Sequence, residues 1–297
     1  MEMHINSPSS ANGLLKVLAA IDASVYSESV IHHAAWAANR LGAPLEFLHV
    51  LERHSDSQSS NDFSGSLALG AQETLLQELA ALDESKSRLA QERGRLLLDH
   101  AQSIALAAQG VRAETKLRHG SLVDNLTESE DEVRLFVLGK RGEHADFAKG
   151  HLGGEVERAV RALHQPLLVA SRAFSAIRRV LIAFDGSPTT RKGVEMMARS
   201  ALFTGMQVEV ITVAKDSDAA HLNMDWALST LTEAGLSSQG HVIAGEPEEV
   251  IVRRVADASI DLLIMGAYGH SRVRRLIVGS TTTSVLRTCH IPVLLLR

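Results

Sequence analysis

Three glycines and two hydroxyl side chains gather near the end of this chain of 297 residues. Gly266 and Gly269 are separated by two residues. Nine residues separate Gly269 from Gly279, which precedes Ser280 and Thr281. Glycine permits positive φ and lets backbone N–H groups approach a ligand without a Cβ in the way. Because the start of a helix offers unpaired N–H groups to a phosphate, a helix beginning after Gly279 would make this stretch a cradle for an anion.

An acidic residue, Asp185, follows the apolar run 180–184. Such a run is typical of a strand that is covered on both faces of a parallel sheet. Ligands of these sheets bind at the carboxyl ends of the strands, where the winding reverses, so we expect Asp185 to face Gly266 across a crevice. A carboxylate for the ribose or base, opposite a loop for phosphates, indicates a nucleoside phosphate. The chain has neither a Walker A sequence nor a GxGxxG motif after its first strand.

The elements that must position these residues occur twice in the chain. The stretch "KVLAAIDAS" (16–24) matches "RVLIAFDGS" (179–187), and "RALHQPLLVAS" (161–171) matches "RTCHIPVLLLR" (287–297). In each half, short apolar runs alternate with helical patterns, as in stacked strand–helix units. We therefore predict an α/β fold of two tandem doubly wound domains. Each has a five-stranded parallel sheet of order 3-2-1-4-5 with helices on both faces.

The halves differ in length, and the difference marks an insertion. We place the first domain at 1–171, a linker at 172–178 and the second domain at 179–297. The first domain has an insertion at about 53–90, a Ser-rich stretch followed by helix formers that predict one long helix or two broken near Asp83. We expect its leucines to pack on the chain's own sheet, with a partner surface as the alternative. These leucines are Leu75, Leu79, Leu82, Leu89 and Leu96.

Together, these features resemble the universal stress proteins. The resemblance rests on the spacing of Gly266, Gly269 and Gly279–Ser280, on "FDGS" after the first strand and on "IPVLLLR" as the last strand. It covers nearly the whole chain, twice, so the chain is similar to a tandem universal stress protein. The resemblance implies that the second domain binds ATP, with or without Mg²⁺. The implied contacts are Ala183, Phe184, Asp185, Val213, Met265, Gly266, Gly269, Gly279, Ser280, Thr281 and Thr282.

The first half departs from this pattern where a phosphate would bind. Ten residues, not nine, separate Gly142 from Gly153. Glu155 stands where the second half has Thr281, and a carboxylate at the start of a helix opposes a second anion. Lys140 could compensate for this charge. Ligand binding in the first half therefore stays open, beside the alternative of a loop kept only for the fold.

No catalytic or metal centre is predicted. His270 could contact a phosphate, and we count it among the nucleotide contacts, but no second acid or base forms a dyad with it. Four metal ligands of suitable type and spacing are not found in the sequence. His164 and His290 precede the final strands at matched positions, which indicates a structural role. Whether the protein is an enzyme stays open, and at most we expect a weak ATPase activity.

The ends of the two halves and the composition bear on partners and location. The resemblance implies that paired domains associate through their final strands, and duplication makes this pairing intramolecular. Whether two chains form a homodimer is left open. The net charge of −5 gives no pull toward nucleic acid. No apolar run is long enough to span a membrane, and the first residues lack a secretory pattern, so we expect a cytoplasmic protein.

Two classes of function follow from these observations. The first is an ATP-binding protein of the stress response, whose nucleotide is a bound regulator or is hydrolysed slowly. The alternative is an interaction or scaffold module without nucleotide, which uses the helical insertion and the domain-pairing strands. A true nucleotide hydrolase or transferase is a third possibility, and the missing acid–base pair counts against it.

Overall fold

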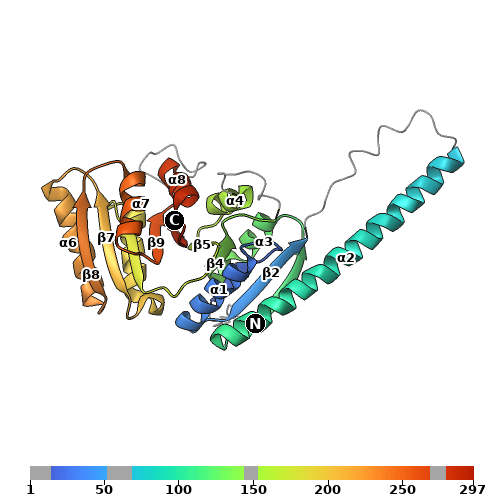
Figure 1. The fold of residues 1–297 in the computed structure, drawn as a ribbon, viewed down its shortest axis with the longest axis horizontal. Coiled ribbons are helices and arrows are strands. Elements are labelled where there is room, and N and C mark those ends of the chain that lie inside the picture. Colours follow the sequence, from blue (N-terminus) through green and yellow to red (C-terminus); the bar gives the residue numbers. More distant parts are fainter. Residues whose placement is uncertain (1–14, 52–68, 144–152, 268–278) are drawn as a thin grey trace, which may run out of the picture.

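A computed structural model describes residues 15–51, 69–143, 153–267 and 279–297 (Figure 1). The first half contains β1 (Lys16–Ala20), α1 (Ser27–Leu41), β2 (Leu45–Leu51), α2 (Leu69–Gln109), β3 (Ala113–His119), α3 (Leu122–Glu128), a 3₁₀ turn (Glu130–Glu132), β4 (Val133–Gly139), α4 (Gly154–Ala162) and β5 (Leu167–Ala170). The second half contains β6 (Arg179–Ala183), α5 (Pro188–Arg199), a 3₁₀ turn (Ala201–Phe203), β7 (Gln207–Val213), α6 (Asp218–Glu233), β8 (Ser237–Ile243), α7 (Pro247–Asp257), β9 (Leu262–Gly266), α8 (Ser280–Thr288) and β10 (Val293–Leu296).

The strands of the described residues form one ten-stranded sheet in the order β3-β2-β1-β4-β5-β10-β9-β6-β7-β8. Neighbouring strands within each half are parallel, and the order 3-2-1-4-5 occurs twice, which confirms the predicted fold class. At the join, β5 and β10 lie antiparallel, with Val169 opposite Val293. The two five-stranded sheets are therefore continuous with each other in this structure.

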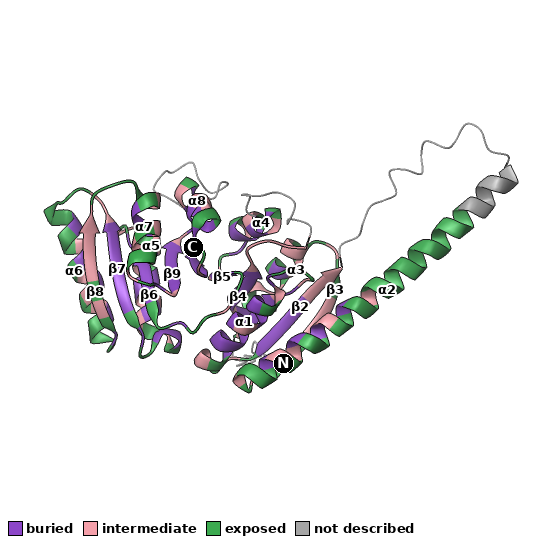
Figure 2. Ribbon diagram, in the orientation of Figure 1, coloured by how far each residue is buried: buried purple, intermediate pink, exposed green. Residues whose placement is uncertain are grey.

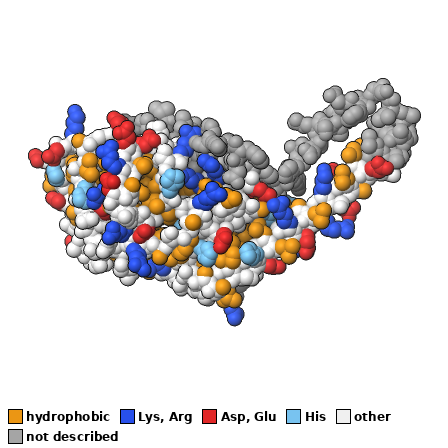
Figure 3. Space-filling view, in the orientation of Figure 1, with side chains coloured by type: hydrophobic (Ala, Val, Ile, Leu, Met, Phe, Trp, Pro, Cys, Tyr) orange, Lys and Arg blue, Asp and Glu red, His pale blue; other side chains and the backbone are white. Residues whose placement is uncertain are grey.

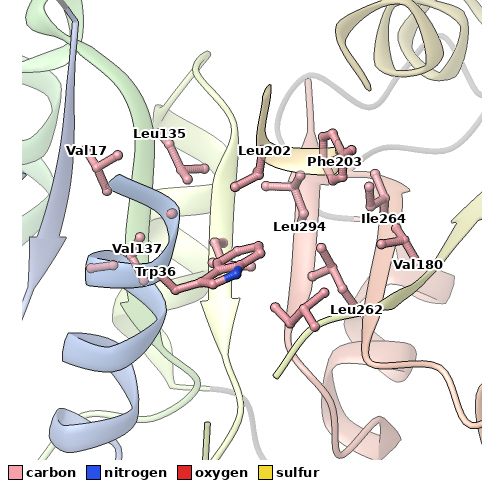
Figure 4. Packing of buried hydrophobic residues seen from close by; sticks show 14 of the residues in the cluster. Val17, Trp36, Leu135, Val137, Val180, Leu202, Phe203, Leu262, Ile264 and Leu294 are labelled. Atoms are coloured by element: carbon pink, nitrogen blue, oxygen red, sulfur yellow. The ribbon is translucent and has the colours of Figure 1, made fainter. Parts of the chain in front are cut away.

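Helices cover both faces of the sheet (Figure 2). On one face, α1, α2, α5 and α6 contribute buried side chains to a hydrophobic cluster that crosses from one half to the other. Trp36 and Val137 of the first half belong to this cluster together with Leu202 and Leu294 of the second (Figure 4). On the opposite face, α3, α4, α7 and α8 pack in a second cluster. Each half is thus a three-layer unit, and the core is shared along the sheet.

Short sequence signals set the elements around the predicted site. Ser187 caps α5, because its side chain accepts a hydrogen bond from the Thr190 N–H, and Pro188 occupies the first turn. Pro247 likewise occupies the first turn of α7. In β9, four of the five residues are buried, which fits a strand between two helical layers. The carboxyl ends of β6 and β9 are therefore held by a rigid core.

The long helix α2 decides between two open alternatives and corrects one expectation. It is a single helix of 41 residues, with no break near Asp83. Only its C-terminal part packs on the sheet, where Leu98, Ala101 and Ala105 are buried. The helix is about 60 Å long, whereas the seven-residue strands β2 and β3 reach only about 23 Å, so its N-terminal part extends beyond them (Figure 1). Exposed on that part are Leu79, Leu82, Leu89 and Leu96, while the side chain of Leu75 lies outside the description.

Two basic residues bind helix ends across the join between the halves. Lys140, which follows β4, donates a hydrogen bond to the carbonyl of Cys289 just after α8 (2.7 Å). Arg297, which follows β10, donates to the carbonyls of Arg161 (2.6 Å) and Leu163 (2.7 Å) at the end of α4. Unpaired carbonyls at a helix end favour a cation.

The position of Lys140 changes the expected electrostatics of the first half. The sequence suggested that this lysine offsets Glu155 at the start of α4, but its ammonium group donates to the carbonyls of Arg287, in the last turn of α8, and Cys289, just after it. Burial lowers the pKa of Lys140 below its usual value. Lys140 therefore stabilises the contact between the two halves of the chain.

Candidate functional site

The predicted site lies at the carboxyl ends of three adjoining strands of the second half. β6 pairs with both β7 and β9, so the three ends lie at one edge of the sheet. Ala183 ends β6, Val213 ends β7 and Gly266 ends β9, and each of these residues is half-buried. The fold thus brings together predicted residues that are up to 83 positions apart in the sequence.

Two of the predicted residues belong to the core. The side chains of Phe184 and Met265 are 2% and 5% exposed. The Phe184 ring stacks on Trp226, with ring centroids 6.0 Å apart, and its carbonyl accepts a hydrogen bond from the Thr212 hydroxyl (2.9 Å). These contacts hold the end of β6 in place, so Phe184 serves to position Asp185, which follows it.

Asp185 is exposed and closes a tight turn into α5. Its Oδ1 accepts hydrogen bonds from the N–H of Ser187 (2.9 Å) and from the hydroxyl of Thr190 (2.7 Å). Aspartate commonly bonds the backbone two residues on in this way. The turn aims the carboxylate at the start of the helix. That Asp185 also faces Gly266 stays a prediction.

The start of α8 is held against the end of β9 by two hydrogen bonds. The N–H of Gly279 donates to the carbonyl of Ala267 (3.2 Å), and the hydroxyl of Thr282 donates to the carbonyl of Gly266 (3.1 Å). Both bonds link segments that are far apart along the chain. A helix start is therefore placed directly beside a strand end, as the anion cradle requires.

Gly279 is the N-cap of α8 and supplies no side-chain cap. A glycine in this position has no oxygen to accept the N–H groups of the first turn, so these donors stay available for a ligand. Ser280 is exposed and Thr281 is half-buried beside them. The other two predicted contacts of this loop, Gly269 and His270, lie outside the described residues.

Positive φ does not explain the loop glycines that the structure describes, and for Gly153 of the first half the reason is close approach. Gly279 has a φ of −56°, and Gly266 is not among the glycines with positive φ. In the first half, a Cβ on Gly153 would lie 3.3 Å from the Cα of Arg141. The backbone segments after β4 and before α4 touch there, and a larger side chain would separate them.

The first half has a pocket of about 670 Å³ at the matched place. It is formed by the ends of β1, β2 and β4, by the start of α4 and by one side of α2. Its lining includes residues that match the predicted contacts of the second half by the sequence repeat. Among them are Asp22, Val50, Gly139, Gly142, Gly153 and Glu155.

Asp22 spans the crevice of the first half. Its Oδ1 accepts a hydrogen bond from the N–H of Ser24 (3.0 Å), and its Oδ2 accepts one from the N–H of Glu143 (3.0 Å), beyond the glycine after β4. A Cβ on Gly142 would lie 3.2 Å from Oδ2. An aspartate in this position therefore reaches the loop on the far side of the crevice.

The charges around this pocket are paired. Arg93 of α2 forms an ion pair with Glu143 (2.7 Å), and Arg158 forms one with Glu155. One oxygen of Glu155 is buried and has no hydrogen-bond partner among the described residues. A carboxylate at the start of α4 lowers the affinity of this pocket for a polyphosphate.

Sequence reasoning missed the contribution of α2, whose residues Ala90, Arg93 and Leu97 line the pocket. The helix comes close because Gly94 faces β2, where a Cβ would lie 2.8 Å from the ring of His49. A signal existed, since Gly94 is the single glycine in the helix-forming stretch 71–109. A glycine inside such a stretch often marks a close approach.

His49 and Thr212 occupy matched positions and perform the same task. His49 Nδ1 lies 2.8 Å from the carbonyl of Ile21, and the Thr212 hydroxyl bonds the carbonyl of Phe184. In each half, the bonded carbonyl belongs to the residue before the aspartate of the crevice. Both side chains therefore fix the end of the first strand of their half.

A matched pair of buried glutamates lies away from the crevice. Glu46 of β2 pairs with Lys16 (3.2 Å) and Lys116 (2.8 Å). Glu209 of β7 pairs with Arg254 beside a pocket of about 340 Å³. Burying a carboxylate is costly unless it is paired, so these cations give each glutamate a structural role.

Two further properties concern the described parts of the chain as a whole. Among those residues, no cluster of three or more histidine, cysteine, aspartate or glutamate side chains is placed to hold a metal ion. None of the helices there combines the length and the apolar character that crossing a membrane requires.

Comparisons with known proteins agree with the geometry. The family model "Universal stress protein family" matches residues 14–171 and 176–297. The universal stress protein Slr1230 of Synechocystis sp. is 37% identical over 284 residues, which cover 95% of this chain and 99% of that protein. A crystal structure of a universal stress protein from Archaeoglobus fulgidus covers 94% of this chain and 97% of its own, with a TM-score of 0.69 and 20% identity. A shorter universal stress protein from that organism, solved in complex with dAMP, covers 42% of this chain, with a TM-score of 0.33 and 18% identity.

Proposed function

Because the chain belongs to the universal stress protein family, with one family match in each half, we propose that its second half binds ATP. The nucleotide occupies the crevice at the ends of β6, β7 and β9. It acts in the stress response as a bound regulator or is hydrolysed slowly. Mg²⁺ can accompany the phosphates.

The observation that carries this proposal is the start of α8. Its cap is a glycine without a side-chain oxygen, and two hydrogen bonds hold it beside the end of β9. The first-turn N–H groups and the hydroxyls of Ser280 and Thr281 are suitable donors for phosphate oxygens. Polyanion binding is the chemistry that this arrangement favours.

Residues at the ends of the neighbouring strands would contact the ribose and the base. Asp185, an exposed carboxylate at the end of β6, would accept hydrogen bonds from the ribose or the base. Val213, half-buried at the end of β7, would contact the adenine. Gly269 and His270 complete the proposed set of contacts in the loop.

A charge exchange between the matched helix starts tests the proposal. Thr281→Glu gives α8 the carboxylate that Glu155 gives α4. We expect the dissociation constant of ATP to rise about tenfold or more, because a carboxylate about 4 Å from a phosphate costs about 1 kcal/mol even in water and more where water is excluded. Titration calorimetry of the nucleotide-free protein measures the change.

Thr281→Val is the matched control, because it removes the hydroxyl and adds no charge. We expect it to weaken ATP binding much less than Thr281→Glu does. Asp185→Ala should weaken binding as well and should abolish any slow release of phosphate. Unchanged affinity in both Thr281→Glu and Asp185→Ala would exclude this corner as the ATP site.

A second candidate site is the 670 Å³ pocket of the first half. We propose that it takes a nucleoside or a nucleotide with fewer phosphates, because Asp22 is in place and Glu155 opposes a polyanion. Glu155→Thr should then increase the affinity of this pocket for ATP. A chain that still binds one ATP after this change would show that charge is not what separates the halves.

We also propose a domain division of 1–171, 172–178 and 179–297, with the halves held together by β5 and β10 and with the protein located in the cytoplasm. The continuous sheet and the cross-bonds of Lys140 and Arg297 support the pairing. An interaction module without nucleotide is the alternative function. The exposed part of α2 supports an interaction role, which could exist together with nucleotide binding.

A further inference from the structure

Residues 76–96 of α2 form an exposed helical arm (Figures 1 and 3). The arm is about 30 Å long, and nearly all of its residues are exposed. Leu82, Leu89 and Leu96 are 50%, 69% and 61% exposed. Most helices in proteins are stabilised by burying an apolar face, whereas these leucines are not covered by any of the residues that the structure describes.

The arm leucines repeat every seven residues. Leu82, Leu89 and Leu96 continue a series that begins in the sequence at Leu75. Leu79, three residues before Leu82, lies on the same side of the helix and is 42% exposed. A strict seven-residue repeat of apolar residues is typical of a helix that pairs with another helix.

The charges of the arm are divided between its two ends. Residues 76–85 carry three acidic side chains and no lysine or arginine. Residues 86–96 carry four basic side chains and a single acidic one. The acidic residues of the first part are Glu78, Asp83 and Glu84, and the basic residues of the second are Lys86, Arg88, Arg93 and Arg95.

We propose that the arm pairs in antiparallel orientation with the arm of a second copy of this chain. In an antiparallel pair, the acidic part of each arm lies beside the basic part of the other. Opposite charges therefore face each other at both ends of the pair. About a centre between Ser85 and Lys86, Leu82 lies level with the partner's Leu89, and Asp83 with the partner's Arg88. Parallel arms would place like charges together.

The chain's own sheet cannot cover the arm. The C-terminal end of the arm already contacts the sheet through Gly94, and α2 continues without a break to the buried Leu98 and Ala101, so the rest of the arm cannot fold back without breaking the helix. The Glu84–Arg88 ion pair, 3.3 Å within one arm, is exposed and free to exchange partners at little cost. Self-complementary charge and leucine spacing therefore select a second arm as the occupant.

Sedimentation of the full chain over a range of concentrations tests the proposal. We expect the wild type to dimerise reversibly, and Leu82→Ser/Leu89→Ser to raise the dimer dissociation constant by at least about 100-fold. Both side chains are exposed, so urea unfolding of the variant should match that of the wild type. A monomeric wild type, or a dimer that this variant does not weaken, would overturn the proposal.

Charge reversal tests the orientation. Glu78→Lys/Asp83→Lys/Glu84→Lys makes both parts of the arm basic and should weaken an antiparallel dimer about tenfold or more. Adding Lys86→Glu/Arg88→Glu/Arg95→Glu should restore the affinity. Parallel arms would show no loss in the first variant, because its facing parts would repel no more than those of the wild type.

Discussion

At the scale of single residues, the two halves use matched positions for the same backbone tasks and for different ligand chemistry. His49 and Thr212 hold the same carbonyl in their two halves. Glu155 and Thr281, in contrast, give the two helix starts opposite tendencies toward phosphate. Matched positions of the two halves therefore keep the same fold contacts while differing in ligand chemistry.

His33 of α1 is expected to make stability depend on pH. It is fully buried, its Nδ1 lies 2.7 Å from the carbonyl of Ser29, and its ring meets the edge of Phe174. Burial lowers the pKa of His33 to about 4. The unfolded chain takes up this proton from about pH 6.5 downward, so up to about 3 kcal/mol of the free energy of unfolding is lost between pH 6.5 and 4.

The measurement is the urea midpoint as a function of pH. His33→Gln keeps a side-chain N–H and does not titrate, so its stability should fall less over this range than that of the wild type. His100→Gln, at an exposed position of α2, is the matched control and should follow the wild type. Equal acid sensitivity in His33→Gln and the wild type would remove His33 as the cause.

At the scale of elements, α2 is one continuous helix whose C-terminal part packs on the core and whose N-terminal part is exposed. Its C-terminal part closes the pocket of the first half, and its N-terminal part leaves the sheet. Helix propensity is high along the whole stretch, so the sequence predicts the helix well. Which leucines are buried depends on where the strands end, and the sequence pattern does not contain that information.

Gly94 is expected to control how closely α2 approaches the sheet. Gly94→Val would meet the ring of His49 and the side chain of Leu117, each 2.8 Å from the Cβ position. We expect a loss of about 1–3 kcal/mol in the free energy of unfolding. Ala80→Val, at an exposed position of the same helix, tests propensity alone and should cost under about 1 kcal/mol. Similar losses in both variants would contradict a close contact.

At the scale of the whole molecule, the two halves share one sheet and one hydrophobic cluster. Final strands with apolar side chains would be exposed edges in an isolated half, and their pairing removes those edges. Lys140 and Arg297 add bonds in both directions across the join. In this structure, the duplicated halves therefore cover each other's final strands.

We expect the chain to unfold in a single cooperative transition, because the sheet and the core run through the join. Scanning calorimetry checks this through the agreement of the calorimetric and van't Hoff enthalpies. Arg297→Ala leaves the carbonyls of Arg161 and Leu163 without this donor and should lower the midpoint by a few degrees. Arg172→Ala, at an exposed site, should leave it unchanged. Two separate transitions in the wild type would contradict a shared core.

The sequence was informative wherever local pattern and the repeat decide the structure. The apolar run before Asp185, the alternation of strand and helix patterns and the matched final strands predicted the fold class and the strand order. Helix capping and strand burial depend on neighbours in the chain, so short stretches carry their signal. That topology predicted that Asp185 and Gly266 lie at one crevice, whereas the remaining site residues came from the family resemblance and stay a prediction.

Only the tertiary structure decided which residues from distant segments meet. It brought α2 to the pocket through Gly94, turned Lys140 from Glu155 to the carbonyls at the end of α8, and left the arm leucines in solvent. Each outcome depends on distances across the sheet and on the length of the strands beneath a helix. Sequence periodicity records which face of a helix is apolar, whereas the surface that faces it is set by the three-dimensional path of the chain.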